Sequence, residues 1–223
     1  MDKSNDRRDY GYAKSLNLYI NVLYQSFKST LYFNFWPMNS RIRQIGDPIL
    51  RQVSSSIPLS HVADADLQAL IDHMQSILDG IKAISDENGN ALSAPQVGQP
   101  VRLILLRIDG EFCPMINPEF TPISEEKFEF EEECFSLYDK RAVILRYRHV
   151  KLSYLDRAGR AQSKELVGEN AGLVQHEIDH LDGVLFVDHV DEGYLYDIDT
   201  VLANDPNRLT QVKDMMAYMV SKA

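Results

Sequence analysis

Cysteine is scarce in this sequence, which has only Cys113 and Cys134 among its 223 residues. Two thiols are too few for a disulfide scaffold, and thiols that stay reduced are typical of cytoplasmic proteins. Long apolar runs are also missing, because the longest candidate, residues 15–27, is shorter than the roughly 18 residues that a membrane helix needs. We therefore expect a cytoplasmic protein with no membrane partner.

Basic residues are in the minority, with 23 Lys and Arg against 33 Asp and Glu and a formal net charge of -10. Because phosphate contacts need clustered basic side chains, this balance argues against broad binding to nucleic acid or anionic lipid. We expect no direct sequence-specific binding of nucleic acid. Organellar transit peptides avoid acidic residues, whereas the first ten residues contain three aspartates, so no targeting segment is expected.

The N-terminal segment differs in composition from the rest of the chain. A charged start is followed by an aromatic-rich stretch from Leu16 to Trp36. The sequence from Met38 onwards looks like the natural start of a protein. We therefore predict an extension over residues 1–37, either translated upstream sequence or a docking arm. Residues 38–223 are predicted to form the folded domain that carries the candidate catalytic residues.

Hydrophobic periodicity predicts helices on both sides of a strand-rich middle. Apolar residues recur every three or four positions from Asp64 to Lys82, which is typical of a helix packed on one side. The fold class is therefore predicted to be α+β, with mixed or antiparallel strands around a central helix. The predicted elements are a short helix over 47–53, a helix over 64–82, strands over 101–108, 128–130 and 142–155, a helix over 168–181 and a last helix after Asp205-Pro206.

The sharpest chemical signal is the stretch His176-Glu177-Ile178-Asp179-His180. Residues four apart on a helix share a face, so His176 and His180 can bind one metal ion. Glu177 lies beside them, where a carboxylate can take a proton from attacking water and return it to a leaving amine. The alternative is a chance match on a polar helix face.

Candidates for a third metal ligand distinguish between classes of metallohydrolase. In one large class a histidine follows the second histidine by six residues, but Phe186 occupies that position and cannot bind a metal. Another class uses a downstream glutamate, for which Glu192 is available. Upstream lies Cys134, and a thiolate with two imidazoles makes a three-ligand site that leaves a position for water. The alternative interpretation of Cys134 is a buried core thiol.

Three motifs, in this order, resemble those of the peptide deformylase family. The family's Gly-x-Gly-Leu-Ala-Ala-x-Gln is similar to residues 89–96, Gly-Asn-Ala-Leu-Ser-Ala-Pro-Gln. Its Glu-Gly-Cys-Leu-Ser is similar to residues 132–136, Glu-Glu-Cys-Phe-Ser, and its His-Glu-x-Asp-His-Leu to residues 176–181. The likeness runs from about Met38 to the C-terminal helix. Further matches are Gly46-Asp47-Pro48, Asn117-Pro118, Arg141, Arg146 and Gln175.

The resemblance implies a metal-dependent hydrolase that removes the formyl group from the N-terminal methionine of nascent polypeptides, close to the ribosome. Glu177 would transfer the proton. The side-chain amide of Gln96 and the backbone N–H of Phe135 would stabilise the oxyanion. The implied cofactor is one divalent metal ion, Fe²⁺ with Zn²⁺ or Ni²⁺ as alternatives, held by Cys134, His176 and His180.

The resemblance also assigns a substrate-binding set, in which two residues depart from the family pattern. Ala91 and Glu133 replace glycines, so both add bulk where backbone lies close to substrate, and Glu133 is expected to bring negative charge near the metal. Arg141 and Arg146 either contact the peptide or are solvated strand charges. Hydrolysis of another N-acyl peptide, and peptide binding without catalysis, are the alternatives left open by the altered pocket. The full set is Asn90, Ala91, Glu133, Arg141, Glu169, Gly172 and Leu173.

Overall fold

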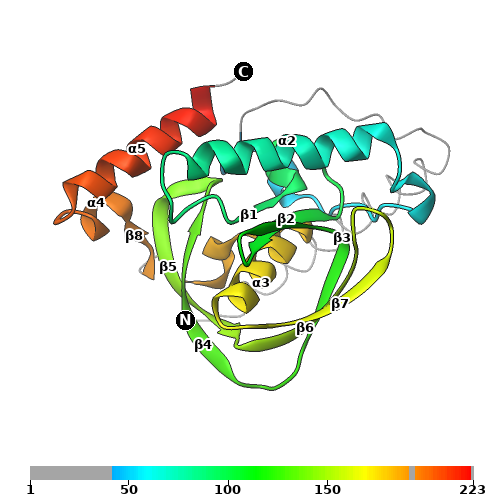
Figure 1. The fold of residues 1–223 in the computed structure, drawn as a ribbon. Helices are drawn as coiled ribbons and strands as arrows, with labels where there is room; N and C mark the ends of the chain where they lie inside the picture. Colours follow the sequence, from blue (N-terminus) through cyan, green and yellow to red (C-terminus); the bar gives the residue numbers. More distant parts are fainter. Residues whose placement is uncertain (1–41, 191–193, 222–223) are drawn as a thin grey trace, which may run out of the picture. The chain divides into compact units, whose positions relative to one another are not determined.

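The structure is a computed structural model that describes residues 42–190 and 194–221 (Figure 1). The predicted extension over residues 1–37 lies outside the described residues. Within them the fold is α+β, as predicted, and the strands of both sheets pair antiparallel. No helix in the described ranges is both long enough and apolar enough to cross a membrane.

The larger sheet has five strands in the order β1-β2-β3-β6-β7. The first three strands of the chain are neighbours in this sheet, the next two strands belong to the smaller sheet, and β6 and β7 belong to the larger sheet again. Buried apolar side chains of these strands form a core with the helix α3. The strands are β1 (Ala91–Ser93), β2 (Leu103–Ile108), β3 (Glu111–Pro122), β6 (His149–Leu155) and β7 (Ala161–Val167).

The smaller sheet consists of a hairpin and one short strand. β4 (Lys127–Cys134) pairs with β5 (Leu137–Tyr147), and β8 (Tyr196–Asp197) pairs with the other edge of β5. Successive side chains of a strand point to opposite faces of the sheet. Glu132 and Cys134 of β4 are accordingly buried, whereas Glu133 between them is exposed.

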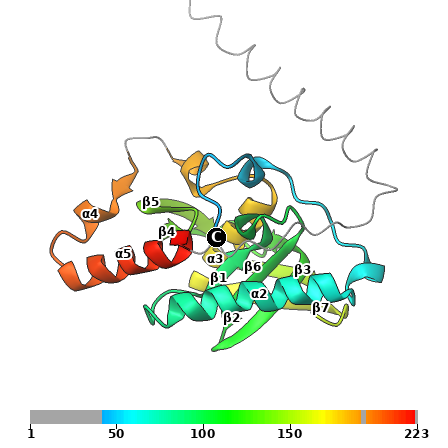
Figure 2. The same ribbon diagram turned by 90° about the horizontal axis from the view of Figure 1, so that it is seen from above.

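Helix α3 (Glu169–Leu181) contacts strands of both sheets, and Figures 1 and 2 show it lying beside them. One stripe of the helix, with Ala171, Val174 and Ile178, is buried in the core of the larger sheet. The side chain of Gln175 holds the helix against β5, because it accepts from the backbone N–H of Tyr147 at 3.0 Å and donates to the Tyr147 carbonyl at 2.9 Å. The helix is thereby fixed against both sheets.

Helix α2 (Ala65–Lys82) packs against β1 and β2. Its seven buried apolar residues are those that the periodicity predicted, so this prediction is confirmed: Leu67, Leu70, Ile71, Met74, Ile77, Leu78 and Ile81. The short helix α4 (Ile198–Val201) contacts β5, and α5 (Pro206–Ser221) ends the described chain. The 3-10 turns are η2 (Pro48–Arg51), η3 (Leu59–His61), η4 (Ala94–Val97) and η5 (Phe186–His189).

The predicted single strand over residues 142–155 is wrong. The segment is divided between β5, which ends at Tyr147, and β6, which begins at His149, and the two strands belong to different sheets. Arg148 lies at the crossing, where its N–H donates to the Glu126 carbonyl and its own carbonyl accepts from Gly168. In both strands buried and exposed residues alternate, so the sequence pattern does not reveal that the chain passes from one sheet to the other at Arg148.

Candidate metal centre

Three side chains that were predicted to bind a metal meet between β4 and α3. Cys134 is the last residue of β4, while His176 and His180 lie one turn apart on α3. Cys134 Sγ and His180 Nε2 are 3.2 Å apart, and one ligand atom from each of the three residues lies within 4.8 Å of the others. All three side chains are buried. In the part of the chain that the structure describes, no other His, Cys, Asp and Glu side chains converge in this way.

This donor set fits a divalent metal ion. Zinc binds thiolate sulfur at about 2.3 Å and imidazole nitrogen at about 2.0 Å, so that two such ligands of a tetrahedral site lie about 3.5 Å apart. The separation of 3.2 Å between Cys134 Sγ and His180 Nε2 is close to that value. One thiolate and two imidazoles also leave a fourth position for water or substrate.

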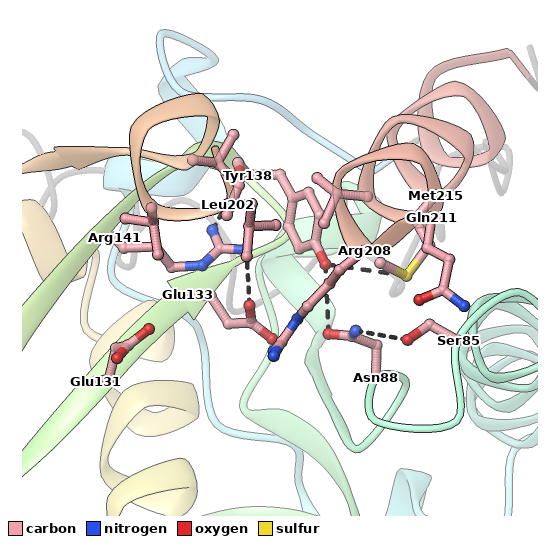
Figure 3. A pocket seen from close by; sticks show the side chains of 13 residues that line it. Ser85, Asn88, Glu131, Glu133, Tyr138, Arg141, Leu202, Arg208, Gln211 and Met215 are labelled. Carbon is pink, nitrogen blue, oxygen red and sulfur yellow. Dashed lines mark hydrogen bonds and ion pairs between the residues drawn. The ribbon is translucent and has the colours of Figure 1, made fainter. Parts of the chain in front are cut away.

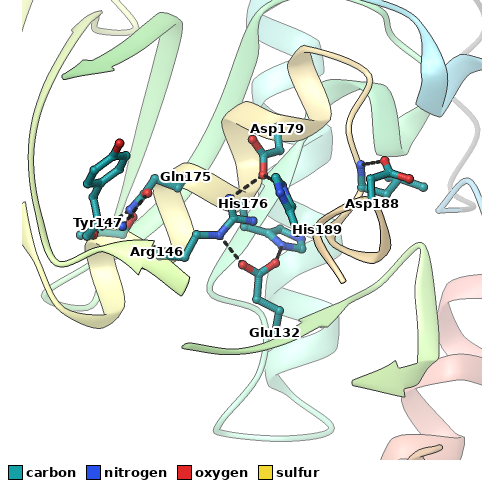
Figure 4. Close-up of polar contacts among 10 residues, drawn as sticks. Glu132, Arg146, Tyr147, Gln175, His176, Asp179, Asp188 and His189 are labelled. Carbon is teal, nitrogen blue, oxygen red and sulfur yellow. Dashed lines mark hydrogen bonds and ion pairs between the residues drawn. The ribbon is translucent and has the colours of Figure 1, made fainter. Parts of the chain in front are cut away.

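A buried carboxylate orients the first histidine, as Figure 4 shows. Glu132 lies two residues before Cys134 on the same face of β4, and its Oε2 is 2.6 Å from His176 Nδ1. His176 therefore has Nε2 available for a metal. Burial alone would raise the pKa of Glu132, but the hydrogen bonds and charges of His176 and Arg146 outweigh burial and lower the pKa to about 2. Glu132 is thus ionised at neutral pH.

Arg146 extends this network away from the candidate metal position (Figure 4). Its Nε donates to Glu132, and its Nη1 donates to Asp179 Oδ2 at 2.6 Å. The Nε2 atom of His189 lies 2.8 Å from the same oxygen of Asp179. Arg146 and Arg141 are both buried, so the alternative that they are solvated strand charges is wrong.

The two histidines of the site have opposite shifts in pKa. For His176, burial lowers the pKa, but the hydrogen bonds and charges of Cys134 and Glu132 outweigh burial and raise it well above its usual value. For His180, burial and the charge of His176 both lower the pKa. Because a metal binds only neutral imidazole, the raised pKa of His176 opposes metal binding at low pH.

Glu177 supplies a buried carboxyl group with spare hydrogen-bonding capacity. Its Oε2 is buried and has no hydrogen-bond partner among the described residues. Burial raises the pKa of Glu177 to about 7, although the charge of His176 and a hydrogen bond from Ser93 oppose the rise. A carboxyl group with a pKa near neutrality can both take up and return a proton.

The amide of Gln96 directs its NH₂ group towards the same site. Its Oε1 accepts from the backbone N–H of Ser93 at 2.9 Å. Because a backbone N–H can only donate, the amide atom that faces it must be the oxygen. Gln96 Nε2 then lies 3.6 Å from Cys134 Sγ and 3.3 Å from Ser136 Oγ. Phe135, the residue predicted to offer a backbone N–H, follows Cys134 directly and is half-buried.

Glu133 does not bring a free negative charge to the site, and this expectation is corrected. Its carboxylate lies 2.7 Å from the guanidinium of Arg141, which is buried and also donates to the carbonyls of Tyr138 and Lys140. Figure 3 shows this ion pair on the side of β4 and β5 that faces α4 and α5. The pair lines a small polar cavity of about 70 Å³, to which Arg208 of α5 also contributes.

The other predicted substrate-binding residues are distributed along β1 and the first turns of α3. Ala91 is buried in the core of the larger sheet, and Leu173 packs against that core. Asn90 is half-buried and donates to the Glu87 carbonyl at 2.8 Å, whereas Glu169 is exposed at the start of α3. Of these four residues, Glu169 alone is exposed.

Gly172, the last member of that set, lies one turn before His176 on α3. A Cβ atom at this glycine would lie 2.8 Å from the ring of Phe130, which is in β4. Phe130 therefore occupies the space that a larger side chain at position 172 would need. Phe130 was predicted only as part of the strand over 128–130, although the alternation of β4 puts it on the same face as Glu132 and Cys134.

Sequence reasoning also missed the residues that surround the candidate ligands. Glu132 was noted only as part of a motif, although its spacing of two from Cys134 signals a shared face of a strand. Ser93, which bonds to both Gln96 and Glu177, carries no comparable signal. The contact between Asp179 and His189 joins residues ten apart that lie on different helices, so periodicity could not reveal it.

Comparison with known proteins identifies the family. The family model described as "Polypeptide deformylase" matches residues 39–194. The chain belongs to the peptide deformylase family. It is an enzyme, a hydrolase that acts as a deformylase on polypeptide N-termini.

Relatives and solved structures agree with this family assignment. A "Peptide deformylase" of Treponema pallidum (strain Nichols) is 38% identical over 151 residues, which are 68% of this chain and 88% of that protein. One from Mesorhizobium japonicum is 41% identical over 149 residues, 65% of this chain and 80% of that protein. The crystal structure of peptide deformylase from Thermotoga maritima matches with a TM-score of 0.59 and 32% identity, covering 70% of this chain and 99% of that one.

Proposed function

We propose that this deformylase removes the formyl group from the N-terminal methionine of nascent polypeptides in a metal-dependent reaction. The observation that carries the proposal is the convergence of Cys134, His176 and His180 beside the buried carboxyl group of Glu177. The substrate would be the N-terminal peptide of a chain near the ribosome, in the cytoplasm. A crystal structure of a peptide deformylase from Acinetobacter baumannii has Met-Ala-Ser bound, and its similarity to this chain supports a peptide substrate that begins with methionine.

We propose Fe²⁺ as the metal, with Zn²⁺ or Ni²⁺ as substitutes in vitro. Cys134, His176 and His180 are its ligands. When bound, such an ion lowers the pKa of water and polarises a carbonyl oxygen. The remaining chemistry belongs to side chains and backbone of this chain.

Glu177 takes a proton from the attacking water and gives it to the amine that leaves when the formyl C–N bond breaks. Its unpartnered Oε2 and its pKa of about 7 suit both steps. The NH₂ group of Gln96 and the backbone N–H of Phe135 donate to the formyl oxygen as it becomes negative. The orientation of the Gln96 amide, fixed by Ser93, supports its part in this step.

The peptide is proposed to lie along β4 and the start of α3. The wall around its first side chain is formed by Asn90, Ala91, Glu169, Gly172 and Leu173. At Gly172 the ring of Phe130 takes up part of the space inside this wall. The ion pair of Glu133 and Arg141 lies on the opposite face of β4 and β5, at the cavity near α5, where each charge is compensated by the other.

The test is formate release from a formyl-Met tripeptide by Fe²⁺- or Ni²⁺-loaded protein, with an acetyl-Met tripeptide as the control. Glu177→Ala should keep about one metal ion per chain while turnover falls by roughly 10²- to 10⁴-fold. Cys134→Ala should lose the metal itself. Metal loss in both variants would contradict the role of Glu177, and equal hydrolysis of the acetylated control would contradict the proposed substrate.

A further inference from the structure

We propose that His189 is a positioning residue for the metal centre, which it affects through a chain of hydrogen bonds that ends at His176. The inference rests on the proposed metal ligands but assigns a role to a residue outside the three motifs. His189 lies in η5, and no part of the proposed reaction uses it. Its role follows from the contacts that connect five side chains in Figure 4.

The chain of contacts is continuous from the surface to the metal position. His189 Nε2 is 2.8 Å from Asp179 Oδ2, which also accepts from Arg146 Nη1 at 2.6 Å. Arg146 donates from Nε to Glu132, whose other oxygen is 2.6 Å from His176 Nδ1. Because a carboxylate only accepts, His189 must donate its Nε2–H to Asp179.

Arg146 depends on both carboxylates for its orientation. It is buried, and its Nη2 has no hydrogen-bond partner among the described residues. Contacts at Nε and Nη1, one with Glu132 and one with Asp179, therefore fix the plane of the guanidinium. If Asp179 turns away, the guanidinium can rotate about its bond to the side chain and change its hydrogen bond to Glu132.

His189 is the second donor that keeps Asp179 in place. One guanidinium charge is shared between two carboxylates, and Asp179 is the more accessible of the two, with a side chain 21% exposed against 0% for Glu132. A second hydrogen bond to Asp179 Oδ2 opposes rotation of this carboxylate towards solvent. Glu132 thereby keeps the geometry that orients His176, as partners of metal-bound histidines generally do.

The position of His189 is itself fixed by its neighbour in η5. Both carboxylate oxygens of Asp188 contact the guanidinium of Arg51, and one of them accepts from the Leu185 N–H at 2.8 Å. The 3-10 turn is therefore anchored at the residue directly before His189. A side chain on an anchored turn can hold its partner in one orientation.

A second histidine provides a matched control. His149 Nε2 is 3.1 Å from Glu165 Oε2, and the His149 side chain is 32% exposed, against 34% for His189. This pair joins β6 to β7, and among the described residues no hydrogen bond or ion pair of His149 or Glu165 reaches the candidate ligands. Both histidines thus lose a similar surface contact with a carboxylate when replaced by alanine, but only one of them is connected to His176.

The experiment compares His189→Ala, His189→Gln and His149→Ala in the full-length protein loaded with Co²⁺. The readouts are the visible absorption spectrum, the rate of Co²⁺ loss to a chelator, and the melting temperature. His189→Ala should change the spectrum and lose Co²⁺ about tenfold faster, which is the lower end of the effect of removing a partner of a metal-bound histidine. His189→Gln should restore most of both, because its amide N–H can donate to Asp179.

Two results would overturn the proposal while leaving the proposed metal ligands in place. If His189→Ala has the spectrum and Co²⁺ loss rate of the unaltered protein, His189 does not act on the metal centre. If His149→Ala changes both readouts as much as His189→Ala does, the effect is general destabilisation. A failure of the unaltered protein to bind Co²⁺ would instead contradict the proposed ligands, and would remove this inference with them.

Discussion

Consecutive glutamates of β4 pair with two different arginines of β5 on opposite faces of the sheet. Glu132 faces α3, where it contacts Arg146 and His176. Glu133 faces α4 and α5, where it contacts Arg141. The Glu132 side chain is fully buried, whereas that of Glu133 is 40% exposed. Two ion pairs of the same residue types therefore lie in different environments because their glutamates are shifted by one position along a strand.

A residue next to a candidate metal ligand need not act on the metal. A period of two in side-chain direction gives Glu132 the same face as Cys134 and sends Glu133 to the other face. Only the inner glutamate can orient a ligand. The outer one compensates the charge of a buried arginine, and substitutions at the two glutamates test this division.

The largest effect is expected at the inner glutamate. Two donors, His176 Nδ1–H and Arg146 Nε–H, meet the two oxygens of Glu132. In Glu132→Gln the amide oxygen can accept from only one of these donors, and the NH₂ group faces the other donor without forming a hydrogen bond. Metal affinity should fall by about 10- to 100-fold, and the free energy of unfolding by about 3 to 5 kcal/mol. Metal titration and denaturant unfolding measure both, and a variant that binds metal normally would refute the orienting role.

The second effect is a loss of activity in acid, which arises at Glu177. A base must be ionised, and burial raises the pKa of Glu177 from 4.5 to about 7 before any bound cation lowers it again. Activity should therefore decline as the pH falls, with the acidic limb of kcat/KM between pH 4.5 and about 7. Metal content must be measured at each pH, since metal loss would imitate this limb. A flat profile over that range with the metal retained would argue against Glu177 as the base.

The smallest effect is expected at the outer glutamate. Glu133→Gln keeps one acceptor near Arg141 but removes the charge, so the free energy of unfolding should fall by about 1 to 2 kcal/mol. Metal affinity should stay within about twofold of the unaltered protein, because the affected contacts lie on the face away from His176. If Glu133→Gln loses metal as Glu132→Gln does, the division between the two faces is wrong.

Local sequence was sufficient for the helices α2 and α3 and for placing two candidate ligands on one face of α3. A spacing of three and four predicts α2 with all its buried residues, and a spacing of four puts His176 and His180 on one face of α3. These signals are local, because a helix repeats within a few residues whatever it packs against. The prediction of one strand over 142–155 was wrong because strands depend on distant partners. Pairing with those partners decides where a strand ends and which sheet it joins.

The sequence by itself determined the family motifs, the candidate ligands and the helix that carries two of them. Tertiary structure alone decided which charges meet: Arg146 with Glu132 and Asp179, Arg141 with Glu133, and His189 with Asp179. The physical reason is that ion pairs across β4, β5, α3 and η5 depend on strand register and helix placement, neither of which is encoded in the spacing of the residues involved. For the same reason the free charge expected at Glu133 became a compensated one once β5 lay beside β4.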